Sequence, residues 1–242
     1  MNIDNRLKRI TDFIPSDSYI LDVGCDHALL DIYLALNRKN VKLIASDINE
    51  NPLKKAQENI RKYNLEDKIT LVKADGISKI NDEVDIVVLA GMGSSTINNI
   101  INKDLEKLKN IKKIIISSHT SNFELRENMN KKGFKIIDEV VVFDKGKYYE
   151  IIVYENGKET LNNLELEYGP IISKRKDSVT KAYFNERYLK LLELYNNIPV
   201  NKKLKEAILS SVKDFKATLF IDELVLNEIE DNYLINKIEL NI

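Results

Sequence analysis

The sequence predicts an α/β fold: a mostly parallel, seven-stranded sheet that ends in an antiparallel hairpin, followed by a C-terminal helical coiled-coil appendage. Short β-branched runs alternate with helical patterns from about Ser18 to about Glu155. The last two runs are separated only by Asp144-Lys145-Gly146-Lys147, a hairpin-type turn. Glycine is absent after Gly169, where the pattern becomes helical. Because strands that alternate with helices join through right-handed crossovers, we expect a parallel sheet closed by an antiparallel pair.

The expected elements follow one another in a regular order. A short amphipathic helix over Ile3–Phe13 ends before Pro15. Helical patterns over Ala28–Asn37 and Pro52–Tyr63 lie between strands, and Pro52 suits a helix start because an N–H is unpaired there anyway. The strands are expected at Tyr19–Val23, Lys42–Ser46, Ile69–Lys73, Val84–Ala90, Lys113–Ser117, Phe134–Phe143 and Tyr148–Tyr154. Five βα units closed by a hairpin are the layout of the Rossmann-like class I methyltransferase fold.

The C-terminal part of the chain has a different pattern. Apolar residues recur there at heptad spacing and then form a second stripe after Pro199. The first stripe is Phe184, Tyr188, Leu191, Tyr195 and Ile198, and the second is Leu204, Ile208, Val212, Phe215 and Leu219. Two helices joined by a short turn predict an antiparallel helical hairpin, with a shorter helix near Glu223–Leu240. We therefore expect a first domain over residues 1–160 and a helical coiled-coil domain over 161–242.

The composition is that of an ordinary soluble protein. The chain has 242 residues and a formal net charge of −1, so no global basic excess indicates nucleic acid. Cys25 is the single cysteine, which excludes an internal disulfide and a Cys-based zinc cluster. No signal-peptide core begins the chain, and no apolar run approaches membrane-spanning length. We expect a cytoplasmic monomer with neither a membrane nor a metal partner.

The most informative segment is the first predicted strand and the turn after it. The predicted strand Tyr19–Val23 overlaps an Asp-x-Gly-x-Asp motif, Asp22-Val23-Gly24-Cys25-Asp26, which is followed by a helical pattern. A glycine at a strand end allows close backbone approach to a ligand, and a helix start offers free N–H groups. The segment lacks the G-x-G-x-x-G motif of a pyrophosphate-binding site. Its acidic side chains would also repel a pyrophosphate group. They suit a ligand with a cationic or hydroxyl-rich face, of which S-adenosylmethionine is the commonest for this layout.

Further glycines and acids follow other predicted strands. Gly76, Gly91 and Gly93, like Gly24, come just after strands, and the ligand crevice of an open α/β sheet lies at the carboxyl ends of its strands. Asp47 follows the second strand, where an acid accepts hydrogen bonds from ribose hydroxyls. Its alternative role is to cap the next helix, although Asn49 and Asn51 could cap that helix equally well. Asp75, directly before Gly76, stands where an acid can meet the adenine amino group, although a solvated turn is an alternative.

The fourth strand is followed by Ala90-Gly91-Met92-Gly93-Ser94-Ser95. Its two glycines leave room to present a planar base to a sulfonium, while a serine there could simply cap the next helix. Both histidines, His27 and His119, are predicted at strand ends on the same edge of the sheet. At least one of them could contact the substrate, and the alternative is that both are ordinary surface residues. Cys25 is not expected to act as a nucleophile, because Asp22 and Asp26 would raise its pKa.

Basic residues gather in the helical part of the chain. Lys174, Arg175, Lys176, Lys181, Arg187 and Lys190 have few acids between them. Such a stripe beside a crevice is typical of a site for a phosphate backbone, although a solvated helical face explains any single lysine equally well.

These residues resemble the bacterial tRNA (adenine(22)-N1)-methyltransferases, class I enzymes with a C-terminal coiled-coil appendage. The matching segments are Asn5-Arg6-Leu7, Phe13-Ile14-Pro15, Leu21–Ala28, Asp75-Gly76, Ala90-Gly91-Met92-Gly93, Gly146-Lys147-Tyr148-Tyr149-Glu150 and Tyr168-Gly169-Pro170 with Lys174. The chain departs from the family at Ser94, where a glycine is usual, and at Ser117-Ser118-His119, where Gln-Pro-Asn is usual. The family's strand-two Gly-Glu pair is Ser46-Asp47 here.

The resemblance implies methyl transfer from S-adenosyl-L-methionine to N1 of an adenine in the D-arm of tRNA. The implied cofactor residues are Asp22, Gly24, Cys25, Asp47, Ile48, Asp75, Gly76, Ala90, Gly91, Met92 and Gly93. The implied catalytic residues are Asp26, His27 and His119, with Asp26 on the exocyclic amine of the adenine. The implied tRNA-binding residues are Arg6, Ser94, Lys174, Arg175, Lys176, Lys181 and Arg187. The alternatives are a methyltransferase for another RNA position or a small molecule, and a non-catalytic tRNA-binding relative.

Overall fold

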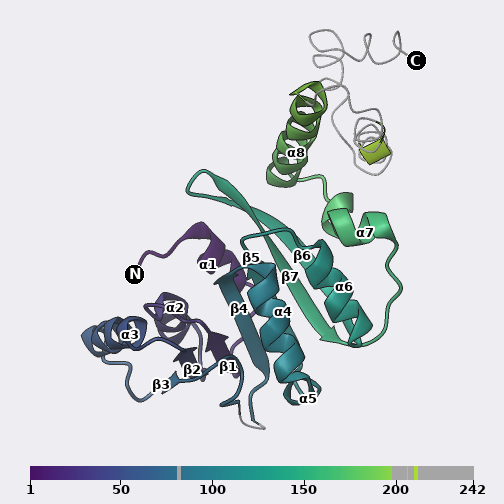
Figure 1. The fold of residues 1–242 in the computed structure, drawn as a ribbon. Coiled ribbons are helices and arrows are strands. Elements are labelled where there is room, and N and C mark those ends of the chain that lie inside the picture. The colour runs from purple at the N-terminus through teal and green to yellow at the C-terminus, as the bar shows by residue number, and fades with distance from the viewer. Residues whose placement is uncertain (81–82, 198–205, 207–209, 212–242) are drawn as a thin grey trace. The chain divides into compact units, whose positions relative to one another are not determined.

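The computed structural model describes residues 1–80, 83–197, 206 and 210–211 (Figure 1). The chain divides into two compact units, Met1–Glu167 and Tyr168–Ile242. The strands of the described chain are β1 (Tyr19–Val23), β2 (Lys42–Asp47), β3 (Ile69–Lys73), β4 (Ile86–Met92), β5 (Lys113–Ser118), β6 (Phe134–Asp144) and β7 (Lys147–Asn156). All of them belong to the first unit.

These strands form one mixed sheet with the order β3-β2-β1-β4-β5-β7-β6. Every neighbouring pair from β3 to β5 is parallel, whereas β7 is antiparallel to both β5 and β6. The predicted fold class is therefore confirmed. The turn between β6 and β7 is Lys145-Gly146, whose φ angles of 48° and 79° are those of a two-residue type I′ hairpin.

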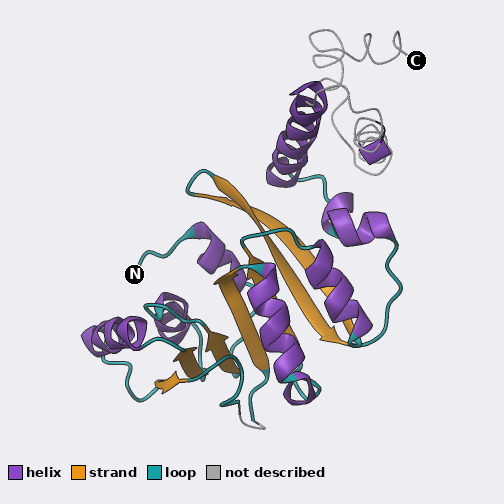
Figure 2. Ribbon diagram, viewed as in Figure 1, coloured by secondary structure: helices purple, strands orange, loops and turns teal. Residues whose placement is uncertain are grey.

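Helices cover both faces of this sheet, as the purple helices on either side of the orange strands in Figure 2 show. The helices up to Tyr168 are α1 (Asn5–Thr11), α2 (Leu29–Asn37), α3 (Glu50–Lys62), α4 (Ser94–Lys103), α5 (Leu105–Leu108), α6 (Phe123–Lys131) and α7 (Asn163–Tyr168). The first three contact one another in sequence on one face, and α4 contacts α6 on the other. The main core cluster lies under α1 to α3, where Ile10, Leu34 and Ile60 are each at most 1% exposed.

Two boundaries differ from the prediction for identifiable reasons. The fourth strand was expected at Val84–Ala90 and is found at Ile86–Met92, because Gly91 at φ 85° forms a bulge beyond which Met92 still pairs with Ser118. The third helix begins at Glu50 rather than Pro52, with Asn49 as its N-cap residue, so that Pro52 falls in the first turn, where no N–H is needed.

In the second unit, a short 3₁₀ turn (Ile172–Lys174) precedes α8 (Ser178–Asn197). Phe184 and Tyr188, from the predicted heptad stripe, are buried. The turn at Pro199, the second stripe from Leu204 to Leu219 and the helix near Glu223–Leu240 fall mainly or wholly outside the described residues, so the coiled coil stays a prediction.

Candidate active site

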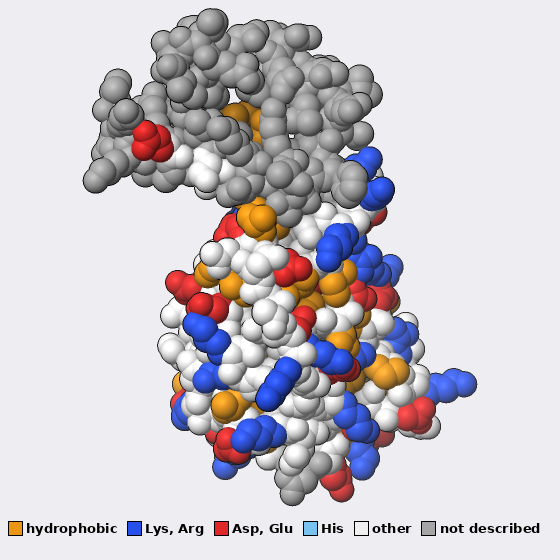
Figure 3. Space-filling view, turned by 90° about the vertical axis from the view of Figure 1, so that its right-hand side faces the viewer, with side chains coloured by type: hydrophobic (Ala, Val, Ile, Leu, Met, Phe, Trp, Pro, Cys, Tyr) orange, Lys and Arg blue, Asp and Glu red, His pale blue; other side chains and the backbone are white. Residues whose placement is uncertain are grey.

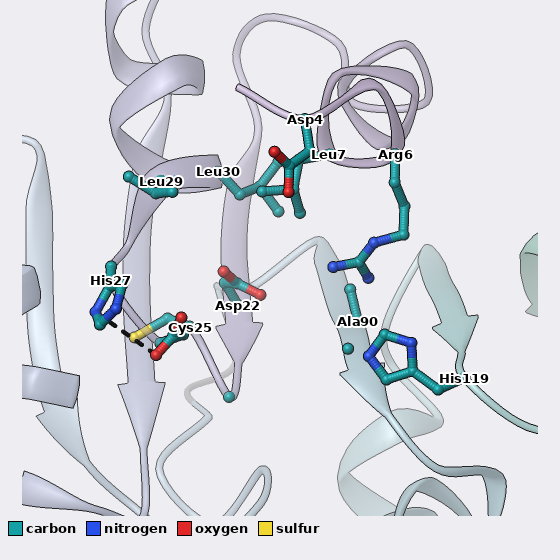
Figure 4. A pocket seen from close by; sticks show the side chains of 13 residues that line it. Asp4, Arg6, Leu7, Asp22, Cys25, His27, Leu29, Leu30, Ala90 and His119 are labelled. Carbon is teal, nitrogen blue, oxygen red and sulfur yellow. Dashed lines mark ion pairs between the residues drawn. The ribbon is translucent and has the colours of Figure 1, made fainter. Parts of the chain in front are cut away.

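Two cavities open at the carboxyl edge of the sheet in the first unit. The larger has a volume of about 680 Å³ and lies over the ends of β1, β2, β3 and β4. The smaller, of about 310 Å³, lies between α1, the β1–α2 loop and the end of β4 (Figure 4). Gly24, Asp26 and Gly91 line both cavities. A molecule in one cavity would therefore meet a molecule in the other at these three residues.

The larger cavity holds an oriented carboxylate at the end of β2. Asp47 is 9% exposed and lines the cavity, and its Oδ1 accepts a hydrogen bond of 2.8 Å from the backbone N–H of Asn49. This bond closes a local turn before α3 and fixes the direction of the side chain. Neighbouring Ile48 is 57% exposed and adds an apolar surface. The pair offers hydrogen-bond acceptors beside an apolar wall, as a nucleoside requires.

The wall of the larger cavity also contains an ion pair. Lys103, in the last turn of α4, places its Nζ 2.5 Å from Oδ2 of Asp75, which follows β3. The bond to Asp75 raises the pKa of Lys103. Both side chains are more than half exposed, so a ligand amino group could compete for the carboxylate.

Gly76 permits close packing of α4 against the β3 end. Its φ is 60°, and a Cβ there would lie 3.0 Å from Cγ2 of Ile100. A side chain would therefore be both conformationally strained and in steric conflict with Ile100. Ile100 itself lines the larger cavity. This glycine thus sets the position of a cavity wall.

Sequence reasoning missed the contribution of α4 to the larger cavity. Thr96, Asn99, Ile100 and Lys103 all line it. Their spacing of three and four residues places them on one face of the helix, so the helical pattern after the Ala-Gly-Met-Gly segment was the available signal.

The loop between β1 and α2 has an unusual backbone. Gly24, Asp26 and Ala28 have φ angles of 73°, 49° and 54°. Such conformations are unfavourable for residues with a Cβ and are often found at functional sites. The N–H groups of Gly24 and Cys25 both donate to the carbonyl of Ser46, at 2.8 and 2.9 Å. These two hydrogen bonds hold the loop against β2.

The smaller cavity receives the side chain of Arg6 from α1. Figure 4 shows its guanidinium pointing into the space between Asp22 and His119. Nη1 of Arg6 is buried and has no hydrogen-bond partner in the described part of the chain. The guanidinium carbon lies 5.3 Å from the centre of the Tyr149 ring, whose centre lies 5.7 Å from that of His119. A buried N–H without a partner is costly, so this donor is suited to a ligand.

Gly91 keeps the space between these groups open. A Cβ at this position, where φ is 85°, would lie 3.7 Å from both Nη2 of Arg6 and Nε2 of His119. Burial and the Arg6 charge lower the pKa of His119 below its usual value. This histidine is therefore neutral at pH 7, as an uncharged base-binding group would be.

A pair of buried acids lies behind the smaller cavity. Asp22 lines the cavity, and burial raises its pKa to about 6. Asp31, in the first turn of α2, is wholly buried, and its carboxyl group shares a side-chain hydrogen bond with that of Asp22. Burial and the nearby Asp22 carboxyl raise the pKa of Asp31 well above its usual value. Sequence reasoning missed Asp31, since one acid within a helix gives no signal of burial.

Three further predicted residues of the β1–α2 loop line the smaller cavity. His27 and Asp26 are close, with 3.6 Å between Nδ1 and Oδ1, and both are partly exposed. Cys25 is buried, and its burial with the nearby acids Asp22 and Asp31 raises the pKa of the thiol. The thiol stays protonated at neutral pH, in the direction that the sequence predicted.

The predicted cofactor residues are thus divided between the two cavities. Asp22, Cys25 and Ala90 line the smaller one, whereas Asp47, Ile48, Asp75, Gly76 and Met92 line the larger. Gly93 is the N-cap residue of α4 and lines neither. Ser94 also lines neither, because its N–H and hydroxyl both bond to Oγ1 of Thr120, at 2.9 and 2.8 Å. The hydroxyl that caps α4 therefore comes from the β5–α6 loop.

The predicted tRNA-binding residues other than Arg6 and Ser94 belong to the second unit. Lys174 and Lys176 are exposed, and Arg175, Lys181 and Arg187 are half-buried. Arg187 lies over the rings of Tyr168 and Tyr183, 5.3 and 5.6 Å from their centres. On the face drawn in Figure 3, basic and acidic side chains are interspersed, in keeping with the net charge of −1.

The described residues contain no cluster of three or more His, Cys, Asp or Glu side chains that could hold a metal ion. A search of the same residues also finds no helix long and apolar enough to cross a membrane.

Comparisons with known proteins agree with this geometry. A family model described as TrmK, tRNA (adenine(22)-N(1))-methyltransferase, matches residues 20–217. The Bacillus subtilis tRNA (adenine(22)-N(1))-methyltransferase is 28% identical over 205 residues, which are 82% of this chain and 86% of that protein. Streptococcus pneumoniae Sp1610 in complex with S-adenosyl-L-methionine has a TM-score of 0.82 and 28% identity, covering 90% of this chain and 100% of that one.

A second similar structure is that of M. capricolum TrmK in complex with S-adenosyl-homocysteine. It has a TM-score of 0.77 and 28% identity, and the match covers 89% of this chain and 96% of that one. The family match spans well over half of the sequence, from β1 into the second unit. The chain belongs to the TrmK family of tRNA (adenine(22)-N(1))-methyltransferases.

Proposed function

We propose that this chain methylates N1 of adenine 22 in the D-arm of tRNA, with S-adenosyl-L-methionine bound in the larger cavity and the adenine in the smaller. The observation that carries the proposal is the junction of the two cavities at Gly24, Asp26 and Gly91. Two of these residues are glycines, which leave room for a methyl donor and an acceptor base to approach each other.

The larger cavity fits the cofactor in size and chemistry. Its volume of about 680 Å³ falls in the range of small-molecule sites. Asp47 would accept hydrogen bonds from the ribose hydroxyls, and Ile48 and Ile100 supply apolar surface for the adenine ring. S-adenosyl-L-methionine supplies a methyl group on a sulfonium, which a nitrogen lone pair can attack in line.

The smaller cavity would orient the target base. N1 of adenine carries a lone pair at neutral pH, so the residues must position the base rather than deprotonate it. The unpartnered Nη1 of Arg6 is a donor for a ring nitrogen, and neutral His119 can accept or donate without adding charge. We assign Asp26 to the exocyclic amine, where positive charge accumulates during transfer.

The other sequence-based predictions enter as parts of this proposal. The predicted helical domain, residues 161–242, would bind the tRNA backbone through Lys174, Arg175, Lys176, Lys181 and Arg187. The enzyme would work in the cytoplasm as a monomer. Ser94 would act indirectly, by its bonds to Thr120 beside His119.

The test is methyl transfer from labelled S-adenosyl-L-methionine to unmodified tRNA transcripts, with the product nucleoside identified by mass spectrometry. We expect 1-methyladenosine from the native transcript and none when adenine 22 is replaced by guanine. Asp26→Asn should lower kcat at unchanged cofactor Kd, whereas Asp47→Asn should raise the cofactor Kd. Methylation of the guanine-22 transcript, or of a small molecule alone, would overturn the assignment.

A further inference from the structure

The β6–β7 hairpin extends beyond the carboxyl edge of the sheet. Pairing between β5 and β7 ends at Ile116 opposite Ile152. Pairing between β6 and β7 continues to Asp144 opposite Lys147. Residues 141–150 therefore form a two-stranded tip, and among the described residues no third strand pairs with most of it. Figure 1 shows this tip projecting past β5.

This tip is fixed beside the smaller cavity. Nζ of Lys145 lies 2.9 Å from Oδ1 of Asp4, and Oδ1 of Asp144 accepts a bond of 3.1 Å from the backbone N–H of Asn5. Asp4 lines the smaller cavity. Because Tyr149 of the tip also contacts Arg6 and His119, two groups of contacts hold the hairpin at the entrance for the target base.

The face of the tip opposite Tyr149 presents an aromatic pair. Phe143 and Tyr148 are cross-strand partners, with ring centres 4.8 Å apart and planes inclined by 54°. Side chains alternate along a strand, so Tyr148 and Tyr149 lie on opposite faces. Phe143 is 47% exposed, although burying a phenylalanine side chain would stabilise the fold. By the same alternation, the exposed Lys147 lies on the face of Tyr149, opposite the aromatic pair.

We propose that the Phe143–Tyr148 pair is a stacking surface for an unpaired nucleobase that neighbours the target adenine in the RNA. Withdrawing one base from its stack leaves the adjacent bases without a partner, and proteins stabilise such bases on aromatic rings. Lys147, on the Tyr149 face of the same tip, supplies positive charge for the RNA phosphate backbone that passes the smaller cavity. The proposal rests on the proposed function, because that function makes the substrate an RNA.

The experiment is direct binding of fluorescent unmodified tRNA to the full chain, with variants at the tip. Stacking of one base contributes about 1–3 kcal/mol, so Phe143→Ala should raise the tRNA Kd about 5- to 150-fold. Phe143→Trp should retain binding, since it keeps an aromatic face. Lys147→Ala should lower the salt dependence of log Kd by roughly one unit of slope. The Kd of S-adenosyl-L-methionine and the melting temperature should be unchanged in all three variants.

The matched control is Leu36→Ala. Leu36 lies near the C-terminal end of α2 and is 46% exposed, nearly the same fraction as Phe143. This variant should bind tRNA as the unchanged chain does.

The outcomes separate this inference from the proposed function. A tRNA Kd that depends on Phe143 supports the stacking surface, even if no methyl transfer occurs. An unchanged Kd in Phe143→Ala overturns it, whether or not the enzyme methylates adenine 22. A chain that binds no tRNA overturns both, and binding of a protein partner in place of RNA at this tip also overturns the inference.

Discussion

The guanidinium carbon of Arg6 lies 5.3 Å from the centre of the Tyr149 ring, so that α1 and β7 meet beside the smaller cavity. Helix α1 is only seven residues long and is the first element of the chain, whereas β7 is the last strand of the sheet. The contact places a buried guanidinium N–H where it faces the cavity rather than solvent. A short terminal helix thus supplies a polar group to the candidate site.

Replacing Arg6 should impair catalysis without affecting the cofactor. Arg6→Ala removes a charged donor to the base, and hydrogen bonds of that kind are worth about 1.5–3 kcal/mol, so kcat/KM for tRNA should fall about 10- to 150-fold. The Kd of S-adenosyl-L-methionine, measured by calorimetry, should not change. Arg9→Ala is the control on the same helix, since Arg9 pairs with Asp12 at the surface. Equal losses in both variants would contradict a role for Arg6 in the site.

Replacing Gly76 should distort the larger cavity. In Gly76→Ala, the new Cβ would meet Ile100 at 3.0 Å while φ stays at 60°, so both strain and displacement of α4 are expected. The free energy of unfolding should fall by about 1–3 kcal/mol, and the cofactor Kd should rise.

Gly133→Ala separates these two effects. Gly133 has a φ of 86°, and a Cβ there would meet no atom within 4 Å. This control should lose about 1–2 kcal/mol from backbone strain and keep the cofactor Kd unchanged. If Gly76→Ala keeps its cofactor affinity too, the packing of α4 on Gly76 does not shape the cavity.

The buried acids should make stability fall as pH rises. In the folded state, burial raises the pKa of Asp22 to about 6 and that of Asp31 well above 3.8. The folded protein therefore binds more protons than the unfolded chain above pH 4, and the associated stability is lost as pH rises through the raised pKa values. Asp31→Asn should be more stable than the unchanged chain at pH 8, by about 1–3 kcal/mol, with a smaller difference at pH 4.

Thermal unfolding at pH 4, 6 and 8 measures this dependence. The exposed Asp67 provides the control, and Asp67→Asn should follow the unchanged chain at every pH. A variant Asp31→Asn that is less stable at pH 8 would show that the carboxyl of Asp31 stabilises the fold when ionised.

A buried ion-pair network beneath the hairpin should be essential for stability. Arg126 on α6 is 1% exposed, and its guanidinium lies 2.8 Å from Glu139 and 2.5 Å from Glu150. Glu150 also accepts a bond of 2.9 Å from Asn122, near the loop that carries His119. Arg126→Met leaves two buried carboxylates without their cation, so the free energy of unfolding should fall by about 3–5 kcal/mol.

Urea unfolding of Arg126→Met and of Lys131→Ala measures the difference. Lys131 pairs with Glu127 at the surface of the same helix, and such pairs contribute only about 0.3–0.5 kcal/mol. A loss below about 1 kcal/mol in Arg126→Met would mean that the network is not needed to hold β6, β7 and α6 together.

Strand positions could be predicted from the sequence because they depend on local patterns. The bounds of β1 and β3 were predicted correctly, and the hairpin turn at Lys145-Gly146 was recognised from its residue types. The fourth strand was placed two residues too early, since a bulge at Gly91 depends on pairing with β5. The α4 wall of the larger cavity could have been found from helical spacing.

The sequence by itself determined the order of strands and helices, the strand-end turns and the edge at which a ligand site would form. Alternation of apolar residues and turn chemistry act between near neighbours, so these features are encoded locally. Only the tertiary structure decided that the edge carries two cavities joined at Gly24, Asp26 and Gly91. It also decided the burial of Asp31 and the contact of Arg6 with Tyr149, because burial and pKa depend on which distant segments pack together.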